Sequence, residues 1–337
     1  MKKMINKTTL RFLCLSTISV LFFSCGNDDD SDDSVGNWVK KSTFNEEARS
    51  SSTAFTLGNL GYMGTGYDGD DYYNDFWSYN MDTNSWQQLA DLPGIARSSA
   101  VSFVINNEGY IGTGYNGDTS QELSDFYKYN EGANTWSQIS DFAGTARYGA
   151  VGFGSDTYGY VGTGYDGSDK KDFWRYDPVT DTWEESIGFG GDKRKDAITF
   201  TINNDVYLAT GISNGVYEED FWVFNLDTEV WTQLEDIDED DDDNYYLFRS
   251  SAVAFTINGK GYIACGEFGS SINTVYEFDP LDEEWEEKTE FELYARRDAI
   301  AFGNGERAFV ALGRNGTLYL DDCMEFFPNA EQDDDDN

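Results

Sequence analysis

The sequence has 337 residues, of which 63 are acidic and 23 basic, giving a formal net charge of −40. This charge argues against binding to nucleic acid, because phosphate contacts need clustered Lys and Arg side chains. It fits a cationic partner, divalent cations or a neutral glycan, or it serves solubility alone. Histidine is absent, which excludes His-ligated metal sites, Ser-His-Asp triads and a His general base. The aromatic content of 16%, with 34 Gly and only 4 Pro, predicts many short strands joined by tight turns.

The N-terminus carries the features of an export signal. An apolar run at residues 12–23 is too short to span a bilayer as a helix, and Ser24-Cys25 follows it. This arrangement resembles a bacterial lipoprotein signal, which implies cleavage of residues 1–24 and a lipid on Cys25. An ordinary secretory signal is the alternative. The basic residues that precede the apolar run are Lys2, Lys3, Lys7 and Arg11.

An acidic segment follows Cys25, and we expect residues 25–37 to form an extended tether. The segment resembles the acidic stretch after the lipidated Cys of surface-exposed lipoproteins of the Bacteroidetes. That resemblance implies a lipid-anchored domain on the outside of the outer membrane. A plain solvated linker is the alternative.

Two residue markers each recur six times. The first is an Arg followed three residues later by a small residue, with 47 to 55 residues between successive copies. The second is a Trp, which in five repeats stands 11 residues before the Arg. The exception has an acidic insertion at residues 235–244, expected to be a solvated loop or a contact for a cation or basic protein. The markers are Arg49, Arg97, Arg147, Arg194, Arg249 and Arg296, and Trp38, Trp86, Trp136, Trp183, Trp231 and Trp285.

Each repeat follows one order of elements. A strand after the Arg is followed by a tight turn, and a second strand ends in small residues such as Gly64-Thr65-Gly66. A longer loop leads to an aromatic third strand, and a fourth strand carries the Trp. These features resemble kelch repeats over residues 38–328. The resemblance implies an all-β, six-bladed β-propeller, with residues 329–337 as an acidic tail.

The sixth repeat has no Trp after its third strand, whereas Trp38 precedes the first repeat. We therefore expect the N-terminal strand to complete the last blade, which leaves no open seam in the ring. Cys265 and Cys323 occupy strand positions, and we expect two separately buried thiols rather than a disulfide.

The candidate ligand-binding residues lie on the longer loops, because these carry the sequence variety. Three loops of adjacent blades share a Tyr-Asp/Asn-Gly pattern, and we expect their side chains to form half a ring that stacks on sugars and hydrogen-bonds to hydroxyls. The alternatives are good turn formation alone, or Ca²⁺ held by Asp68, Asp70, Asp166 and Asp169. The predicted residues are Tyr67, Asp68, Tyr115, Asn116, Tyr165 and Asp166.

A second candidate position lies two residues after each marker Arg. By resemblance to kelch propellers this position lines the channel rim and touches the ligand. It is occupied by Ser51, Ser99, Gly149, Asp196, Ser251 and Asp298, of which we select Asp196 and Asp298. The marker Arg side chains are expected to pair with carboxylates or carbonyls of their own blades.

The sequence predicts a monomeric, non-catalytic cell-surface module that recognises a glycan or a protein and needs no cofactor or metal. One alternative is an enzyme. Kelch propellers include copper galactose oxidases and sialic-acid epimerases, but both rely on His, so only carboxylate or Tyr chemistry would remain. The other alternative is a structural subunit of an outer-membrane complex.

Overall fold

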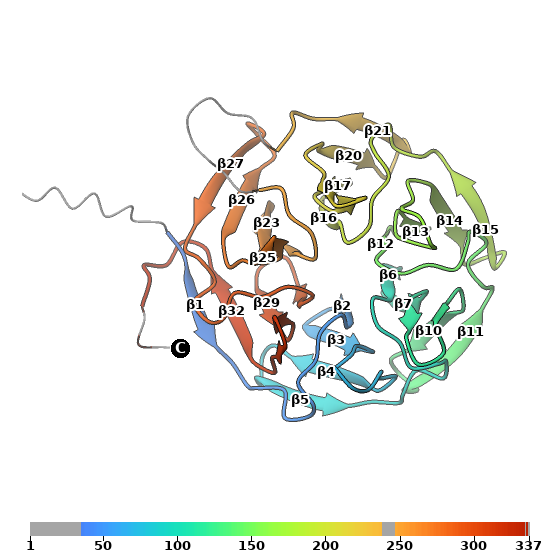
Figure 1. Ribbon diagram of the computed structural model, residues 1–337, viewed down its shortest axis with the longest axis horizontal. Helices are drawn as coiled ribbons and strands as arrows, with labels where there is room; N and C mark the ends of the chain where they lie inside the picture. Colours follow the sequence, from blue (N-terminus) through green and yellow to red (C-terminus); the bar gives the residue numbers. More distant parts are fainter. Residues whose placement is uncertain (1–34, 238–246, 334, 336–337) are drawn as a thin grey trace, which may run out of the picture. The chain divides into compact units, whose positions relative to one another are not determined.

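The computed structural model describes residues 35–237, 247–333 and 335. The signal segment, Cys25, most of the tether and most of the acidic insertion lie outside these residues. Within residues 34–337, which form one compact unit, six four-stranded antiparallel sheets surround a central axis (Figure 1). The prediction of an all-β, six-bladed propeller is therefore confirmed. No helix of the described ranges is long and apolar enough to cross a membrane.

Each of the first three blades runs from the channel outwards in chain order. Blade one consists of β2 (Thr53–Leu57), β3 (Leu60–Gly64), β4 (Phe76–Asn80) and β5 (Ser85–Gln88). Blade two consists of β6 (Val101–Ile105), β7 (Glu108–Gly112), β10 (Phe126–Asn130) and β11 (Thr135–Ile139). Blade three consists of β12 (Val151–Gly154), β13 (Gly159–Gly162), β14 (Phe173–Asp177) and β15 (Thr182–Ser186).

The remaining blades keep this order, except that the last takes its outer strand from the N-terminus. Blade four consists of β16 (Ile198–Ile202), β17 (Asp205–Ala209), β20 (Trp222–Asn225) and β21 (Val230–Gln233). Blade five consists of β22 (Val253–Ile257), β23 (Lys260–Ala264), β26 (Val275–Asp279) and β27 (Glu284–Lys288). Blade six consists of β28 (Ile300–Gly303), β29 (Ala308–Ala311), β32 (Cys323–Phe327) and β1 (Asn37–Lys40).

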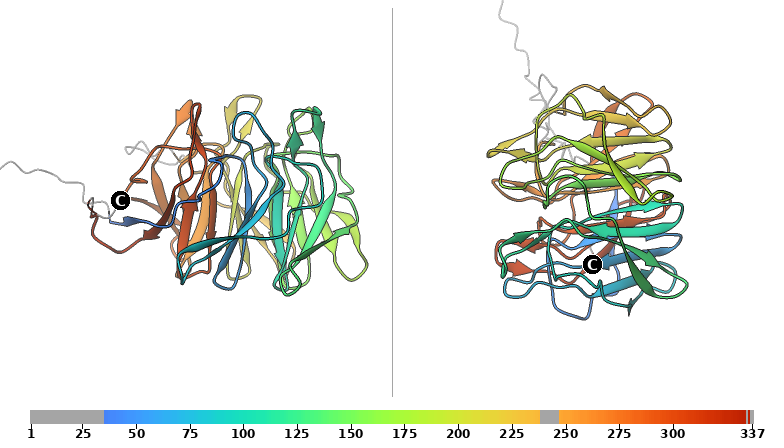
Figure 2. Two further views of the ribbon diagram at one scale, coloured as in Figure 1. Left: turned by 90° about the horizontal axis from the view of Figure 1, so that it is seen from below. Right: turned by 90° about the vertical axis from the view of Figure 1, so that its right-hand side faces the viewer.

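Four small hairpins project from the loops between second and third strands, and Figure 2 shows them on one side of the ring. We call this side the long-loop face. The opposite side, which carries the turns between strands one and two and between strands three and four, is the tight-turn face. The hairpins are β8 (Tyr115–Asn116) with β9 (Gln121–Glu122), β18 (Ile212–Ser213) with β19 (Val216–Tyr217), β24 (Glu267–Phe268) with β25 (Ser270–Ser271), and β30 (Arg314–Asn315) with β31 (Leu318–Tyr319).

The ring closes as predicted. β1 pairs antiparallel with β32, with Trp38 opposite Phe326. The fully buried Trp38 ring lies 4.7 Å from Phe291 and 4.5 Å from Phe326. The backbone N–H of Gly36 donates to the carbonyl of Ala330 at 3.0 Å, so the start of the acidic tail lies beside the N-terminal strand. Because the first and last segments share one sheet, the ring has no exposed strand edge at its seam.

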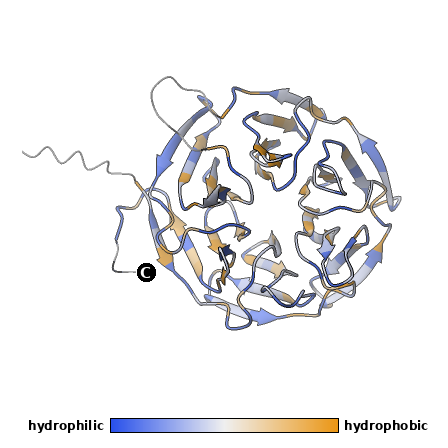
Figure 3. Ribbon diagram, in the orientation of Figure 1, coloured by the Kyte–Doolittle hydropathy of each residue, from blue (hydrophilic) through white to orange (hydrophobic). Residues whose placement is uncertain are grey.

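Aromatic side chains fill the space between blades. The strand-three Phe of one blade packs against the strand-four Trp of the next, with centroids 4.8 Å apart for Phe76 and Trp136 and 5.1 Å for Phe126 and Trp183. Close packing also explains a strand-two glycine, since a Cβ at Gly109 would lie 2.2 Å from the Phe55 ring. The outermost strands are more polar than the inner ones (Figure 3), in keeping with the exposure of most of their residues.

Candidate functional site

The marker Arg side chains tie the long-loop face to the blades. In blade two, the buried guanidinium of Arg97 makes two hydrogen bonds to Asp125, at 2.7 and 2.8 Å, and one to the carbonyl of Thr113 at 3.0 Å. Arg49, Arg147 and Arg296 repeat this bidentate contact in their own blades. In blade five Thr274 stands at the Asp position, and Arg249 donates to its carbonyl and to that of Cys265. The structural role expected for these Arg residues is confirmed.

The position two residues after each marker Arg forms a closed ring of backbone hydrogen bonds at the channel rim. Each N–H donates to the carbonyl of the corresponding residue in the preceding blade, at 2.8 to 3.2 Å. All six residues have a positive φ between 50° and 61°, including Asp196 and Asp298. Sequence analysis did not predict this positive φ. The glycine among the Ser and Asp residues at this position was the available signal for it. The rim ring consists of Ser51, Ser99, Gly149, Asp196, Ser251 and Asp298.

Inside the rim ring lies a narrow central channel of about 220 Å³, lined by the first strands of all six blades. Small side chains such as Ala100, Ala150 and Ala252 contribute to its wall. The repeated small residue three positions after the marker Arg therefore lets the six first strands approach one another around the axis.

The predicted Tyr residues belong to two groups of three Tyr rings on the long-loop face. Tyr67 lies between Tyr72 and Tyr319, with centroids 4.6 and 6.2 Å apart. Tyr148 lies between Tyr115 and Tyr165, at 5.3 and 5.4 Å. All six rings are half-buried. Sequence analysis identified three members of this set, which we call the tyrosine row, and missed Tyr72, Tyr148 and Tyr319.

The polar partners of these Tyr residues are used within their own loops. Asp68 accepts hydrogen bonds from the backbone N–H groups of Asp70 and Asp71 and from the Tyr73 hydroxyl. Burial alone would raise the pKa of Asp68, but these hydrogen bonds bring it below the usual value. Asn116 is buried, donates to the carbonyl of Ala96 at 2.7 Å and accepts from the N–H of Thr119.

Asp166 likewise has a local partner. Its carboxylate lies 2.8 Å from the ammonium of Lys170. Burial opposes ionisation, yet hydrogen bonds from Lys170 and Thr145 lower the pKa of Asp166 to about 2. Asp68, Asn116 and Asp166 therefore shape the loops, and the Tyr rings are the part of the predicted half-ring that remains available to a partner.

A charged cluster joins the end of the tyrosine row to the rim ring. The ammonium of Lys195 lies 5.5 Å from the Tyr148 ring centre, 5.2 Å from that of Tyr165 and 3.7 Å from the Asp196 carboxylate. Burial, together with the nearby charge of Asp298, raises the pKa of Asp196 to about 6 in spite of Lys195. Asp298 itself accepts a hydrogen bond from Arg314 at 2.9 Å.

Two further expectations concern metals and thiols. The described residues contain no group of three or more His, Cys, Asp or Glu side chains placed to hold a metal ion. Cys265 and Cys323 are both free and buried, as expected. Burial raises the pKa of Cys265 to about 12, which makes its thiol unreactive at neutral pH.

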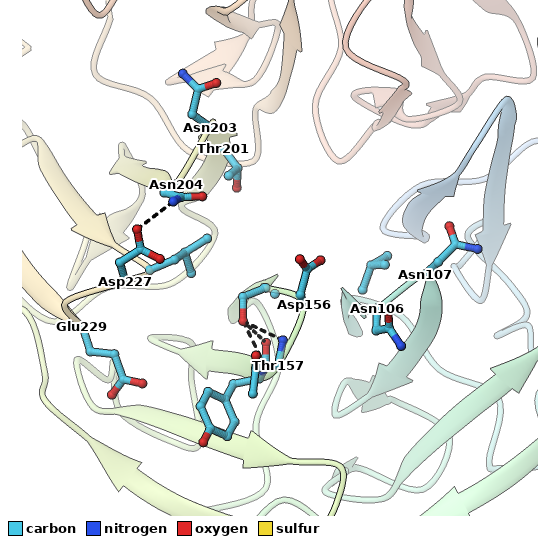
Figure 4. A pocket seen from close by; sticks show the side chains of 14 residues that line it. Asn106, Asn107, Asp156, Thr157, Thr201, Asn203, Asn204, Asp227 and Glu229 are labelled. Atoms are coloured by element: carbon cyan, nitrogen blue, oxygen red, sulfur yellow. Dashed lines mark hydrogen bonds between the residues drawn. The ribbon is translucent and has the colours of Figure 1, made fainter.

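The face that sequence analysis did not select also carries a pocket. A pocket of about 600 Å³ opens on the tight-turn face between blades two, three and four (Figure 4). Its polar lining includes Asn106, Asn107, Asp156, Asn203 and Asp227. The turns that supply these residues are as short as those of the other blades, so loop length gave no signal for the pocket.

Comparison with known proteins supports the repeat assignment. A family model described as the KLHDC2/KLHL20/DRC7 Kelch-repeats domain matches residues 38–197. The solved structure titled "Structure of YjhT" superposes with a TM-score of 0.70 at 16% identity, covering 82% of this chain and 94% of that one. At this identity the likeness concerns the fold alone. No curated protein matches the sequence. The repeat markers, the sheet topology and these matches together identify the chain as a six-bladed β-propeller, of which residues 38–197 match a kelch-repeat domain.

Proposed function

We propose that this chain is a non-catalytic binding module, anchored by lipid at the cell surface, that recognises a protein or a glycan through its long-loop face. Kelch propellers serve as protein-binding or interaction modules, which supports the coarser part of this proposal. The N-terminal basic and apolar residues before Cys25 support the anchor.

The observation that carries the proposal is the tyrosine row. Half-buried Tyr rings offer rigid, amphipathic contact area at a low cost in side-chain entropy, and Tyr is enriched at recognition surfaces. Tyr67 and Tyr165 belong to different blades, so one partner could contact several blades at once. The blade framework, with its Arg–Asp hydrogen bonds, holds these rings in place before binding.

The binding proposal can be tested with a triple variant. The purified full chain, the variant Tyr67→Ala/Tyr115→Ala/Tyr165→Ala and the control Val179→Ala/Leu281→Ala are compared by glycan array and by co-purification with outer-membrane proteins. The control removes side chains that are 90% and 92% exposed, in turns between third and fourth strands on the opposite face. We expect the triple variant to weaken binding by about tenfold or more and the control to leave it unchanged. Equal binding by all three proteins would reject the long-loop face.

The anchor needs its own test. Protease treatment of intact cells should degrade the wild-type chain, and Cys25→Ser should release it from the membrane fraction. A chain that stays in the membrane fraction after Cys25→Ser, or one protected from protease in intact cells, would contradict the proposed location. The monomeric state proposed for the module is checked by light scattering on the same preparation.

One observation favours a second candidate function, a carbohydrate-active enzyme that works without His. Asp196 lies at the channel rim and has a pKa of about 6, which burial and the nearby charge of Asp298 raise. A carboxyl group that titrates near neutrality suits general acid–base catalysis. Activity on a carbohydrate panel that is lost in Asp196→Asn and in Asp298→Asn would establish this function over the binding module.

A further inference from the structure

The pocket on the tight-turn face offers a site that is separate from the tyrosine row. Its walls come from the β6–β7 turn of blade two, the β12–β13 turn of blade three and two turns of blade four. Its volume of about 600 Å³ lies in the range of roughly 300–1,000 Å³ found for small-molecule sites. It is therefore large enough to enclose much of a small ligand.

The pocket exists because blade three lacks bulk where its neighbours have it. Blades two and four end their first strands with the buried residues Ile105 and Ile202, whereas blade three has Ser155 at this position. The preceding residue is Gly154, and a Cβ there would lie 1.9 Å from the carbonyl oxygen of Val104. Blade three thus approaches blade two closely at Gly154.

Several hydrogen-bonding side chains around the pocket are unused. Within the part of the chain that the structure describes, no partner is found for the side chains of Asn106, Asn107, Asn203 and Asp156. Figure 4 shows Asp156 between the two Asn residues of blade two and those of blade four. Asn106, Asn107 and Asn203 have positive φ values of 47°, 62° and 55°, so turn geometry fixes their backbones. Together they present amide donors and acceptors around one acidic acceptor.

The charged side chains that line the pocket indicate which chemical class of ligand it can bind. The lining contains three carboxylates and no Lys or Arg, which disfavours anions. Two of these carboxylates have partners, since Asp227 accepts from Asn204 at 2.8 Å and Glu229 accepts from Arg175 and Tyr160. Only Asp156 remains, too few carboxylates for the oxygen-rich coordination of Ca²⁺. Amides and one carboxylate facing a polar hollow match the paired hydroxyls of a neutral sugar.

We propose that this pocket is a binding site for a neutral carbohydrate of about one or two sugar units. Asn107 and Asn203 hold hydroxyl groups from opposite sides, and Asp156 accepts from a hydroxyl between them. The site does not depend on the tyrosine row, which lies on the other face.

The site is tested by isothermal titration of the purified full chain with cellobiose, maltose and lactose, and with glucosamine, glucuronate and Ca²⁺ as charged probes. The test variants are Asn107→Gly/Asn203→Gly, which keeps the positive φ while removing both amides, and Asp156→Ala. The matched control is Asn258→Gly, at the turn position of blade five that corresponds to Asn203, where φ is 52°. The triple Tyr variant reports whether the long-loop face contributes.

We expect at least one neutral disaccharide to bind, and both test variants to weaken it by about tenfold or more. The control and the triple Tyr variant should bind as the wild type does. Binding that is lost in the triple Tyr variant, or kept in both test variants, would overturn the site. So would a preference for a charged probe, or the absence of heat with all three neutral sugars. Failure of the long-loop proposal leaves these outcomes unaffected.

Discussion

Blades three and six lie on opposite sides of the ring (Figure 1) and begin their tight turns in the same way. Blade three has Gly154-Ser155 where blade six has Gly303-Asn304. Ser155 accepts hydrogen bonds from Thr157 and Tyr158, and Asn304 accepts from Glu306 and Arg307. Both turns therefore obtain their local shape from a short polar side chain.

The two turns differ in their hydrogen bonds to neighbouring blades. In blade six, the N–H of Gly303 donates to Thr56 of blade one, and the carbonyl of Gly305 accepts from the N–H of Asn258 in blade five. Asn304 also donates to Asn59 at 2.9 Å. In blade three, the hydrogen bonds of Ser155 lie within the turn and a pocket opens beside it. A similar local turn thus hydrogen-bonds to both neighbouring blades on one side of the ring and lies beside a pocket on the other.

The third strands show the same contrast in their charges. The sheet registers place Glu325 of blade six and Arg175 of blade three at equivalent positions. Glu325 is 2% exposed, and pairs with Lys41 at 2.8 Å and with Arg307. Arg175 lies 4.2 Å above the Tyr158 ring and pairs with the more exposed Glu229. Blade six therefore depends on a buried charge, whereas blade three uses a partly solvated one.

The largest effect should come from removing these charges. Glu325→Ala leaves two cations beside the seam without their carboxylate, and should lower the free energy of unfolding by about 3 kcal/mol or more. Arg175→Ala should lower it by about 1 kcal/mol, because its ion pairs are partly exposed. Urea unfolding with a common slope measures both. Equal losses of unfolding free energy in Glu325→Ala and Arg175→Ala would show that the buried charge of blade six stabilises the fold no more than the partly exposed charge of blade three.

The long-loop ends of the same blades differ by one side chain. At the rim ring, blade six has Asp298, held by Arg314, whereas blade three has Gly149. A Cβ on Gly149 would lie 2.4 Å from a carboxylate oxygen of Asp196, so the Asp196 side chain packs directly against the glycine. The missing side chain therefore provides the space in which the Asp196 carboxylate lies.

Gly149→Ser tests this account with a residue that other blades already carry. Ser51, Ser99 and Ser251 adopt the same positive φ, so the backbone strain is tolerated and the main cost is displacement of Asp196. We expect a loss of about 1 kcal/mol in the free energy of unfolding. Adding Asp196→Ser should restore most of it, since the two positions are coupled. A double variant no more stable than Gly149→Ser alone would place the strain in the backbone instead.

Sequence analysis could predict the fold because its determinants repeat. The marker Arg and Trp residues gave the blade count, and the missing last Trp gave the closure through Trp38. The Tyr residues of the long loops were found for the same reason. Repeats also explain what was missed. Tyr148 and Tyr319 stand outside the Tyr-Asp/Asn-Gly pattern, and the pocket arises from a difference between blades, namely Ser155 in place of an Ile. Such differences acquire meaning only when the neighbouring blades are in place.

Acid provides the mildest test, because it acts with opposite sign on Glu325 of blade six and on Asp196, the blade-four carboxyl group beside Gly149 of blade three. Burial raises the pKa of Glu325 by itself, but hydrogen bonds from Arg307 and Lys41 hold it below the ordinary value of 4.5. Its stabilisation is therefore complete above about pH 4.5 and is lost as the pH falls through the lower pKa of the folded state. Asp196 has its pKa raised from 3.8 to about 6, so the folded state gains stability as the pH falls from about 6 towards 3.8.

Urea unfolding between pH 7 and pH 3.5 should reveal the two signs separately. The stability difference between the wild type and Glu325→Gln should shrink in acid, because protonation removes the charge that the variant already lacks. As the pH falls through the upper part of this range, the free energy of unfolding of the wild type should rise relative to that of Asp196→Asn. Protonation of Asp196 removes the cost of its buried charge, and the variant has no such charge. Parallel pH profiles for the wild type and both variants would mean that neither carboxyl group has its pKa shifted by its surroundings, and that the seam at Glu325 and the rim beside Gly149 differ in packing rather than in charge.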